Sequence, residues 1–212
     1  MLENAPNLRN RGLPDSLVVS LCAMTQDQTP KAKISDEPLT ADQIAVYRAV
    51  LKDFAKGPNS PLNLANTTEP LDDSRPMFNE ACIKEVGASV PKLSVPISHR
   101  LERLLMPDMH IVLVDPDHQQ KLIDENDPQI LVKKVVDDHE KVTDVQVDQS
   151  VKHAFEVGMF TVSEIVFDKQ HRRAAVAYSF VCGSLCGYGN TLILRKSGQS
   201  WKITKTCSGW VS

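Results

Sequence analysis

The sequence has no long hydrophobic run. A transmembrane helix needs about 18 or more consecutive apolar residues. The longest candidate, Leu17–Met24, is much shorter and contains a serine. We therefore expect no transmembrane segment.

An excess of positive charge is also missing. The chain has 24 basic and 27 acidic side chains and a net charge of -3. Proteins that bind the phosphate backbone of nucleic acids concentrate Lys and Arg. Nucleic acid is therefore not an expected partner.

Common catalytic and cofactor motifs are absent as well. The chain has no Gly-x-Ser-x-Gly elbow, no Walker or dinucleotide-binding glycine pattern and no His-Glu-x-x-His motif. Asp115–His118 and Asp137–Glu140 contain metal-ligand side-chain types, but acidic clusters in turns usually form solvated surface. We expect no metal site and no cofactor.

Cysteine is sparse, with five in 212 residues. If Cys22 belongs to a removed or unstructured leader, four remain, and an even number suits an oxidised domain. Cys182 and Cys186 can face each other across a tight hairpin, with their α-carbons within the roughly 4.4–6.8 Å that a bridge needs. We predict this disulfide; the alternative is a set of reduced, buried thiols.

Residues 1–39 are predicted to be a disordered extension or a degenerate signal peptide. Two arginines precede the apolar run Leu17–Met24 and a polar tract follows it, which is the order of a secretory leader. Pro14 and Asp15 interrupt the apolar region between the arginines and this run. We expect a periplasmic or secreted protein, with a cytoplasmic location as the alternative.

Residues 40–212 are predicted to form a single α+β domain. Thr40–Gln43 fits a capping box, followed by apolar residues at helical spacing. Asp115 and Pro116 predict a further helix start. A shorter helix is expected over Met77–Val86, and a last one capped by Asp148 or Ser150.

The last third of the chain predicts a four-stranded antiparallel meander. Phe160–Asp168 and Arg173–Val181 are rich in β-branched and aromatic residues and are separated by a polar gap. Val176, Tyr178 and Phe180 share one face of their strand, and smaller residues share the other. Helices should therefore pack on a mainly antiparallel sheet.

A loop rich in glycine and cysteine joins two strands of this meander. Its glycines are expected to supply positive backbone angles and a bulge. We predict that the loop and a tryptophan near the end of the chain form an exposed recognition surface. The candidate residues are Gly183, Ser184, Leu185, Gly187, Tyr188, Gly189 and Trp210.

Ser184 and the two loop cysteines are also the nearest candidates for a nucleophile. Their segment superficially resembles the nucleophile region of papain-like proteases, but Gly187 stands where that pattern has tryptophan or tyrosine, and no histidine follows His171. We assign no catalytic residue. A hydrolase with its site beside Cys182–Gly189 is the alternative function.

Glu164 shares a strand face with Val162 and Val166. If the carboxylate were buried it would need a partner, and Arg173 or Arg195 are candidates. We expect Glu164 to lie near the surface.

Three motifs of the meander, Phe160–Ile165, Cys182–Gly189 and Gly209–Ser212, resemble a group of uncharacterised bacterial proteins, many of them exported. The likeness covers about the last third of the chain. No activity is assigned to that group, so the resemblance implies fold texture and export only. The leading hypothesis is a non-enzymatic exported or envelope-associated protein that binds a protein partner or a small ligand.

Overall fold

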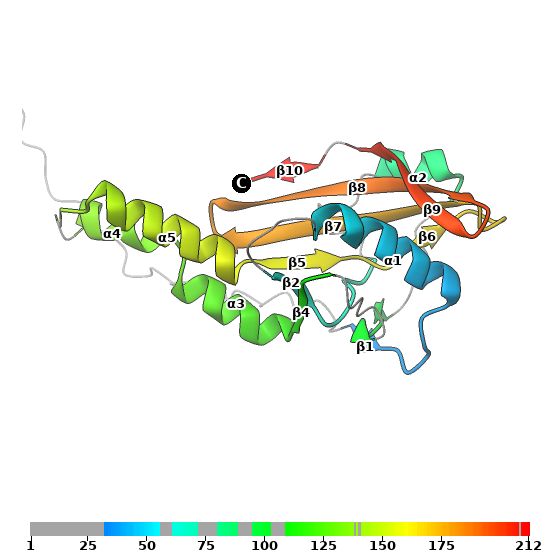
Figure 1. Ribbon diagram of the computed structural model, residues 1–212, viewed down its shortest axis with the longest axis horizontal. Coiled ribbons are helices and arrows are strands. Elements are labelled where there is room, and N and C mark those ends of the chain that lie inside the picture. Colours follow the sequence, from blue (N-terminus) through cyan, green and yellow to red (C-terminus); the bar gives the residue numbers. More distant parts are fainter. Residues whose placement is uncertain are drawn as a thin grey trace, which may run out of the picture.

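Two long antiparallel strands, β7 (Arg173–Gly183) and β8 (Cys186–Ser197), form the centre of the fold (Figure 1). The computed structural model describes residues 32–55, 61–71, 80–88, 95–102, 109–137, 139, 141–207 and 209–212. Its helices are α1 (Ala41–Phe54), α2 (Glu80–Val86), α3 (Pro116–Glu125), α4 (Gln129–Asp137) and α5 (Asp144–Val157). Its other strands are β1 (Lys33–Ile34), β2 (Leu62–Ala65), β3 (Ile97–Ser98), β4 (Ile111–Val114), β5 (Met159–Val162), β6 (Val166–Phe167), β9 (Ser200–Thr206) and β10 (Trp210–Val211).

The large sheet is mainly antiparallel, and the predicted α+β class is confirmed. Its order is β10-β8-β7-β5-β2-β4, with β6 also pairing with β7 and β9 with β8. The meander expected from the sequence is formed by β5 and β6, then β7, β8 and β9. β2 runs parallel to both β4 and β5 and therefore lies inside the sheet.

Helices cover both faces of the central strands, as the side-chain alternation of β7 indicated. Val176, Tyr178 and Phe180 belong to the main core with α1. On the other face, Ala175 packs with Ile83 of α2. Small side chains on this second face leave room for the short helix.

Helix α1 begins as the sequence predicted. The Thr40 hydroxyl accepts a hydrogen bond from the Gln43 backbone, and the Gln43 side chain accepts one from the Thr40 backbone. This capping box satisfies two backbone donors at the helix start. Val46, Tyr47, Val50 and Leu51 then face the core.

Helix α5 begins earlier than expected. Thr143 is its N-cap and forms a second capping box with Gln146, so the prediction that Asp148 or Ser150 caps this helix is wrong. Thr143 and Gln146 have the same spacing as Thr40 and Gln43, but the acidic residues around them favoured a loop, so this capping box was not recognised.

The described chain starts at Ala32, and Lys33–Ile34 pair with β3. Of residues 1–39, which were predicted to be a disordered extension or a degenerate signal peptide, 1–31 lie outside the described residues, whereas 32–39 include β1 and the buried Leu39. The predicted helix start at Met77 also lies outside the described residues. None of the described helices combines the length and apolar character needed to cross a membrane.

Candidate functional site

The turn between β7 and β8 is closed by a pair of cysteines. Cys182 and Cys186 form a disulfide, with α-carbons 5.1 Å apart, in agreement with the sequence prediction. The strand register is irregular between Val181 and Gly183. Ser184 and Leu185 are exposed at the tip of this turn. The covalent ring therefore fixes two exposed side chains on the end of a rigid hairpin.

Asp127 joins this turn to the start of α4. One carboxylate oxygen, Oδ1, accepts the backbone N–H of Gln129 at 2.9 Å. The other, Oδ2, accepts the backbone N–H of Ser184 at 2.8 Å and the Ser184 hydroxyl at 2.6 Å. Gly183 has φ +153°, and a side chain there would meet Asp127 Oδ1 at 3.0 Å. The contact thus requires both the acid and the glycine.

The charge of Asp127 is favoured in this position. Partial burial opposes ionisation, but hydrogen bonds from the Ser184 side chain and from the backbone of Gln129 and Ser184 outweigh it, so the pKa of Asp127 is lowered. The carboxylate is therefore ionised at neutral pH.

Replacing Asp127 by alanine should lower the free energy of unfolding by about 1–2 kcal/mol, the usual cost of a lost helix cap. Asp127→Asn keeps an oxygen acceptor and should cost less. Because the folded-state pKa of Asp127 is lowered, its charge stabilises the protein above the unfolded-state pKa of about 3.9 and this contribution is lost as pH falls through the folded-state value. Urea unfolding at neutral pH and at pH below about 3 measures both effects. A wild-type protein and an Asp127→Asn variant with identical pH dependence would contradict this role.

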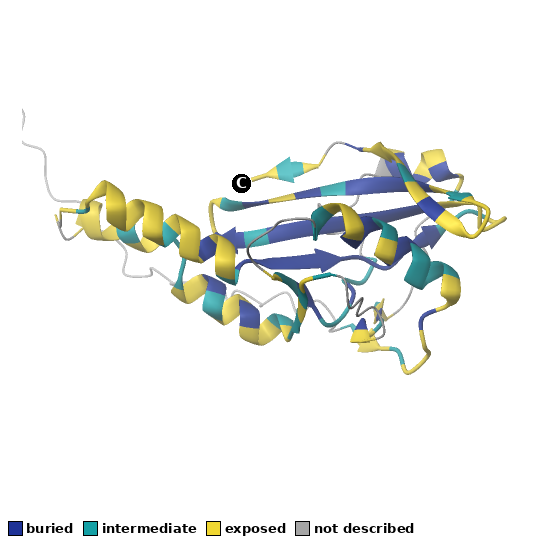
Figure 2. Ribbon diagram, viewed as in Figure 1, coloured by how far each residue is buried: buried dark blue, intermediate teal, exposed yellow. Residues whose placement is uncertain are grey.

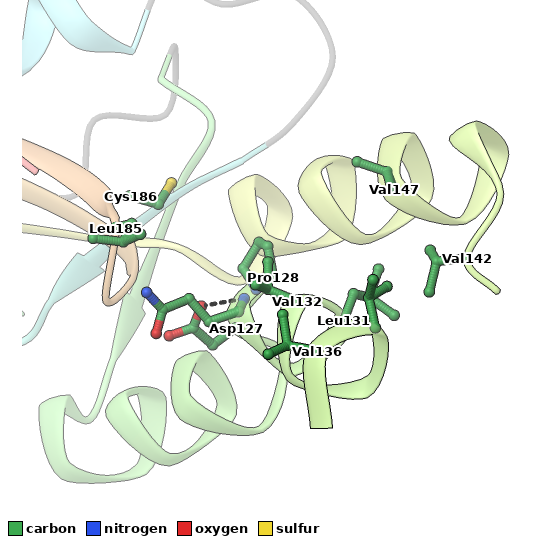
Figure 3. A pocket seen from close by; sticks show the side chains of 11 residues that line it. Asp127, Pro128, Leu131, Val132, Val136, Val142, Val147, Leu185 and Cys186 are labelled. Atoms are coloured by element: carbon green, nitrogen blue, oxygen red, sulfur yellow. Dashed lines mark hydrogen bonds between the residues drawn. The ribbon is translucent and has the colours of Figure 1, made fainter. Parts of the chain in front are cut away.

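An apolar groove lies between the turn and the two helices that follow Asp127 (Figure 3). Its volume is about 400 Å³, which falls within the roughly 300–1,000 Å³ typical of ligand pockets. Besides Asp127, Gln129 and Cys186, its lining residues are apolar. These are Pro128, Leu131, Val132, Val135, Val136, Val142, Val147 and Leu185. We name it the α4–α5 groove.

The walls of the α4–α5 groove are strongly exposed. Leu185 is 69% exposed, Val136 62% and Val132 60%. α4 and α5 extend beyond the end of the sheet, and most of their surface faces solvent (Figure 2). A group of neighbouring apolar side chains that stays exposed to solvent marks a binding surface more often than a surface without function.

The other predicted recognition residues have structural roles. Gly187 and Gly189 do not have positive φ; instead they let the Trp210 ring approach β8, since a Cβ on Gly189 would lie 2.6 Å from Trp210 Nε1. Trp210 is half-buried, and its Nε1 has no hydrogen-bond partner among the described residues. Tyr188 packs against Phe180 on the α1 face. The interpretation of Gly187 and Gly189 as positive-angle residues is therefore wrong, whereas it holds for Gly183.

Glu164 lies elsewhere than expected. It is buried, with 9% exposure, and its partners are Thr68 and His99 rather than an arginine. Oε1 accepts a hydrogen bond from the Thr68 hydroxyl, contacts His99 Nδ1 at 2.9 Å and accepts the His99 backbone N–H at 3.1 Å. The expectation of a near-surface residue is wrong, because two segments distant in sequence bring the polar groups that its burial requires.

The Glu164 cluster does not have the order of a catalytic triad. In a triad the histidine lies between the nucleophile and the acid, whereas here the carboxylate contacts both the Thr68 hydroxyl and His99. Thr68 also accepts the His99 backbone N–H at 2.7 Å. The cluster therefore ties three segments together.

Metal-ligand side chains do not converge in the described part of the chain: no group of three or more His, Cys, Asp or Glu is arranged to hold an ion there. Asp115, from one of the two acidic clusters, accepts the His118 backbone N–H at 2.9 Å and caps α3, as its sequence position predicted.

The sequence interpretation missed Asp127 and the α4–α5 groove. The signal was present, because Asp127 followed by Pro128 repeats the Asp-Pro pattern that was recognised at the start of α3. No helix was predicted over Ile130–Val136, a run of apolar residues interrupted by two lysines that lies in α4.

The fold and site define an α+β protein with a disulfide-closed hairpin beside an open apolar groove. No family model, curated protein or solved structure matches the chain significantly.

Proposed function

We propose that the protein is a non-enzymatic binding protein whose α4–α5 groove takes an apolar segment of a partner protein. The observation that carries this proposal is the exposure of the groove's apolar walls on two helices and a disulfide-pinned turn. Helical grooves of this kind commonly receive the apolar side chains of a partner segment.

A protein segment fits better than a small ligand because the apolar surface continues beyond the groove. Val151 and Phe155 follow the groove residue Val147 at four-residue spacing on α5, and they are also exposed, at 40% and 55%. A small molecule confined to the groove would leave this surface in water, whereas a partner segment could cover it.

An oxidising compartment suits the cysteine pairs. Cys82 with Cys207 and Cys182 with Cys186 form disulfides in the structure, and such bonds persist mainly in periplasmic or extracellular proteins. These pairs support the periplasmic or secreted location expected from the sequence.

The hydrolase alternative has less support at this site. Both loop thiols are paired, and the Ser184 hydroxyl donates to Asp127 directly. No described histidine hydrogen-bonds with Ser184, so the described residues offer no base in contact with this hydroxyl.

Single aspartate substitutions in the groove should weaken its affinity for an apolar probe. We expect Nile red, a neutral dye whose fluorescence rises in apolar surroundings, to bind the wild-type protein. Val136→Asp and Leu185→Asp should each weaken binding by about tenfold or more, since a charge would be desolvated by the bound dye. Both side chains are exposed, so the variants should fold normally.

Val211→Asp is the matched control, because Val211 is 86% exposed on β10 and does not line the groove. Equal dye binding by all four proteins, or loss of binding only in Val211→Asp, would refute the groove as the apolar site.

A further inference from the structure

We propose a second site on this protein: an anion-binding hollow at the opposite end of β7, which takes a phosphate-bearing ligand. The hollow lies between the end of α2, the β6–β7 hairpin and β8, and has a volume of about 530 Å³. It is lined by five cations and one carboxylate; these are Lys169, Arg172, Arg173, Arg195, Lys196 and Asp168. Such a concentration is unexpected in a chain of net charge -3.

The cations form a row across three strands. Arg173 is directly opposite Arg195 in the β7–β8 ladder, and Arg195 is opposite Lys202 in the β8–β9 ladder. Residues directly opposite on antiparallel strands project to the same face, and like charges there destabilise a sheet. The next pair on the same face of this ladder, Ala175 and Ile193, packs with α2. The row of cations therefore lies on the same face of the sheet as α2, at the end of the strands where the hollow is.

Neighbouring acids neutralise only part of this charge. Lys196 binds Asp42 at 2.6 and 2.8 Å. Arg173 donates to the Glu85 carbonyl at the end of α2, and Lys205 takes the Glu85 carboxylate. Lys169, Arg172, Arg195 and Lys202 have no ion pair with another described residue. The ion pairs between described residues join other side chains.

The single carboxylate in the hollow is turned to the backbone. Asp168 Oδ1 accepts the backbone N–H of Arg172 at 2.7 Å and that of Arg173 at 3.0 Å. These two hydrogen bonds fix the hairpin backbone at Arg172 and Arg173, the two consecutive arginines that line the hollow. The Asp168 carboxylate therefore accepts hydrogen bonds from the backbone of the turn. The five cationic side chains that line the hollow outnumber this single carboxylate.

Phosphate is the ligand chemistry that fits this arrangement. A guanidinium group presents paired N–H donors that match two phosphate oxygens, and it is less strongly hydrated than an ammonium group. An anion with two or more charges would relieve the repulsion between Arg173 and Arg195. Free phosphorylated ligands and phospholipid head groups share this chemistry.

Calorimetric titration with sodium pyrophosphate tests the site, with anionic phosphatidylglycerol vesicles and neutral phosphatidylcholine vesicles as a second arm. We expect saturable binding that weakens with salt. The double variant Arg172→Gln with Arg195→Gln should lose about tenfold or more in affinity. Lys133→Gln with Lys134→Gln, which removes two exposed cations from α4, should bind like the wild type.

Each outcome decides the proposal. Pyrophosphate binding lost in the arginine variant supports a free ligand, and binding to phosphatidylglycerol alone, with the same loss, supports a head group. Equal binding by the two double variants, or none to either probe, overturns the site.

A melting temperature of the arginine variant at or above that of the wild type is also expected, because one repulsive pair is removed. This measurement separates loss of binding from loss of folding. Nile red binding at the α4–α5 groove is independent of these results.

Discussion

Replacing Cys82 and Cys207 together by alanine is expected to lower the free energy of unfolding by about 4–5 kcal/mol, close to the most that a disulfide contributes. The two residues are 125 positions apart in sequence, with α-carbons 6.3 Å apart. They join α2 to the chain that follows β9, and both are buried in the small core on the α2 face. In the chain-entropy model, closing so long a loop restricts the unfolded chain strongly.

The Cys182–Cys186 bond provides an internal comparison. Its closed loop is short, with a sequence separation of 4, and the same model gives about 2 kcal/mol. Urea unfolding of the two double-alanine variants, with intact disulfides verified by non-reducing mass spectrometry, measures both costs. Equal losses in the two variants, or a larger loss for Cys182 with Cys186, would contradict the assignment of global stability to the long-range bond.

Replacing Tyr47 by alanine should cost about 3–5 kcal/mol, as for other large aromatic side chains in a core. Tyr47 is fully buried on α1, and its hydroxyl donates to the Ser163 carbonyl at 2.9 Å. Ser163 lies at the break between β5 and β6, where its own hydroxyl accepts the Ala177 backbone N–H at 2.9 Å in place of a ladder carbonyl. Tyr47 therefore holds a point where the sheet is interrupted.

Tyr47→Phe separates the two contributions of this side chain. It keeps the ring and leaves the Ser163 carbonyl without the phenol, so we expect a loss of about 1–2 kcal/mol. Burial, with the nearby charge of Glu164, raises the pKa of Tyr47 well above its ordinary value, so the phenol remains a donor at neutral pH. Thermal unfolding of both variants gives the measurement; a Tyr47→Phe variant as damaging as Tyr47→Ala would show that the ring itself contributes little.

Local patterns predicted those parts of the fold whose causes are local. The capping box at Thr40, the Asp115 cap and the alternation of Val176 with smaller neighbours each depend on residues a few positions apart. The Cys182–Cys186 pair was predictable for the same reason, since one tight hairpin brings both together.

Features that depend on distant segments were not predictable in this way. Thr68 and His99 reach Glu164 from 96 and 65 positions away, so no pattern around Glu164 reveals that its burial is compensated. The partner of Cys82 likewise depends on where α2 docks on the sheet. The α4–α5 groove could not be predicted either, because it exists only where two helices extend past the end of the sheet. A run of valines in the sequence does not indicate that arrangement.

The two proposed sites lie at opposite ends of β7, and their chemistry is opposite as well. The α4–α5 groove beside Gly183 is apolar, whereas the hollow beside Arg173 is cationic. A partner segment and an anionic ligand could therefore bind at the same time without competing for side chains.

The α4–α5 groove is tested most directly by methyl NMR of protein labelled at valine and leucine methyl groups and titrated with Nile red. We predict saturable shifts of the methyl signals of Val132, Val136, Val147 and Leu185, with Val211 unchanged. Shifts spread over exposed methyl groups throughout the molecule, or none at these four residues, would contradict the proposed binding site.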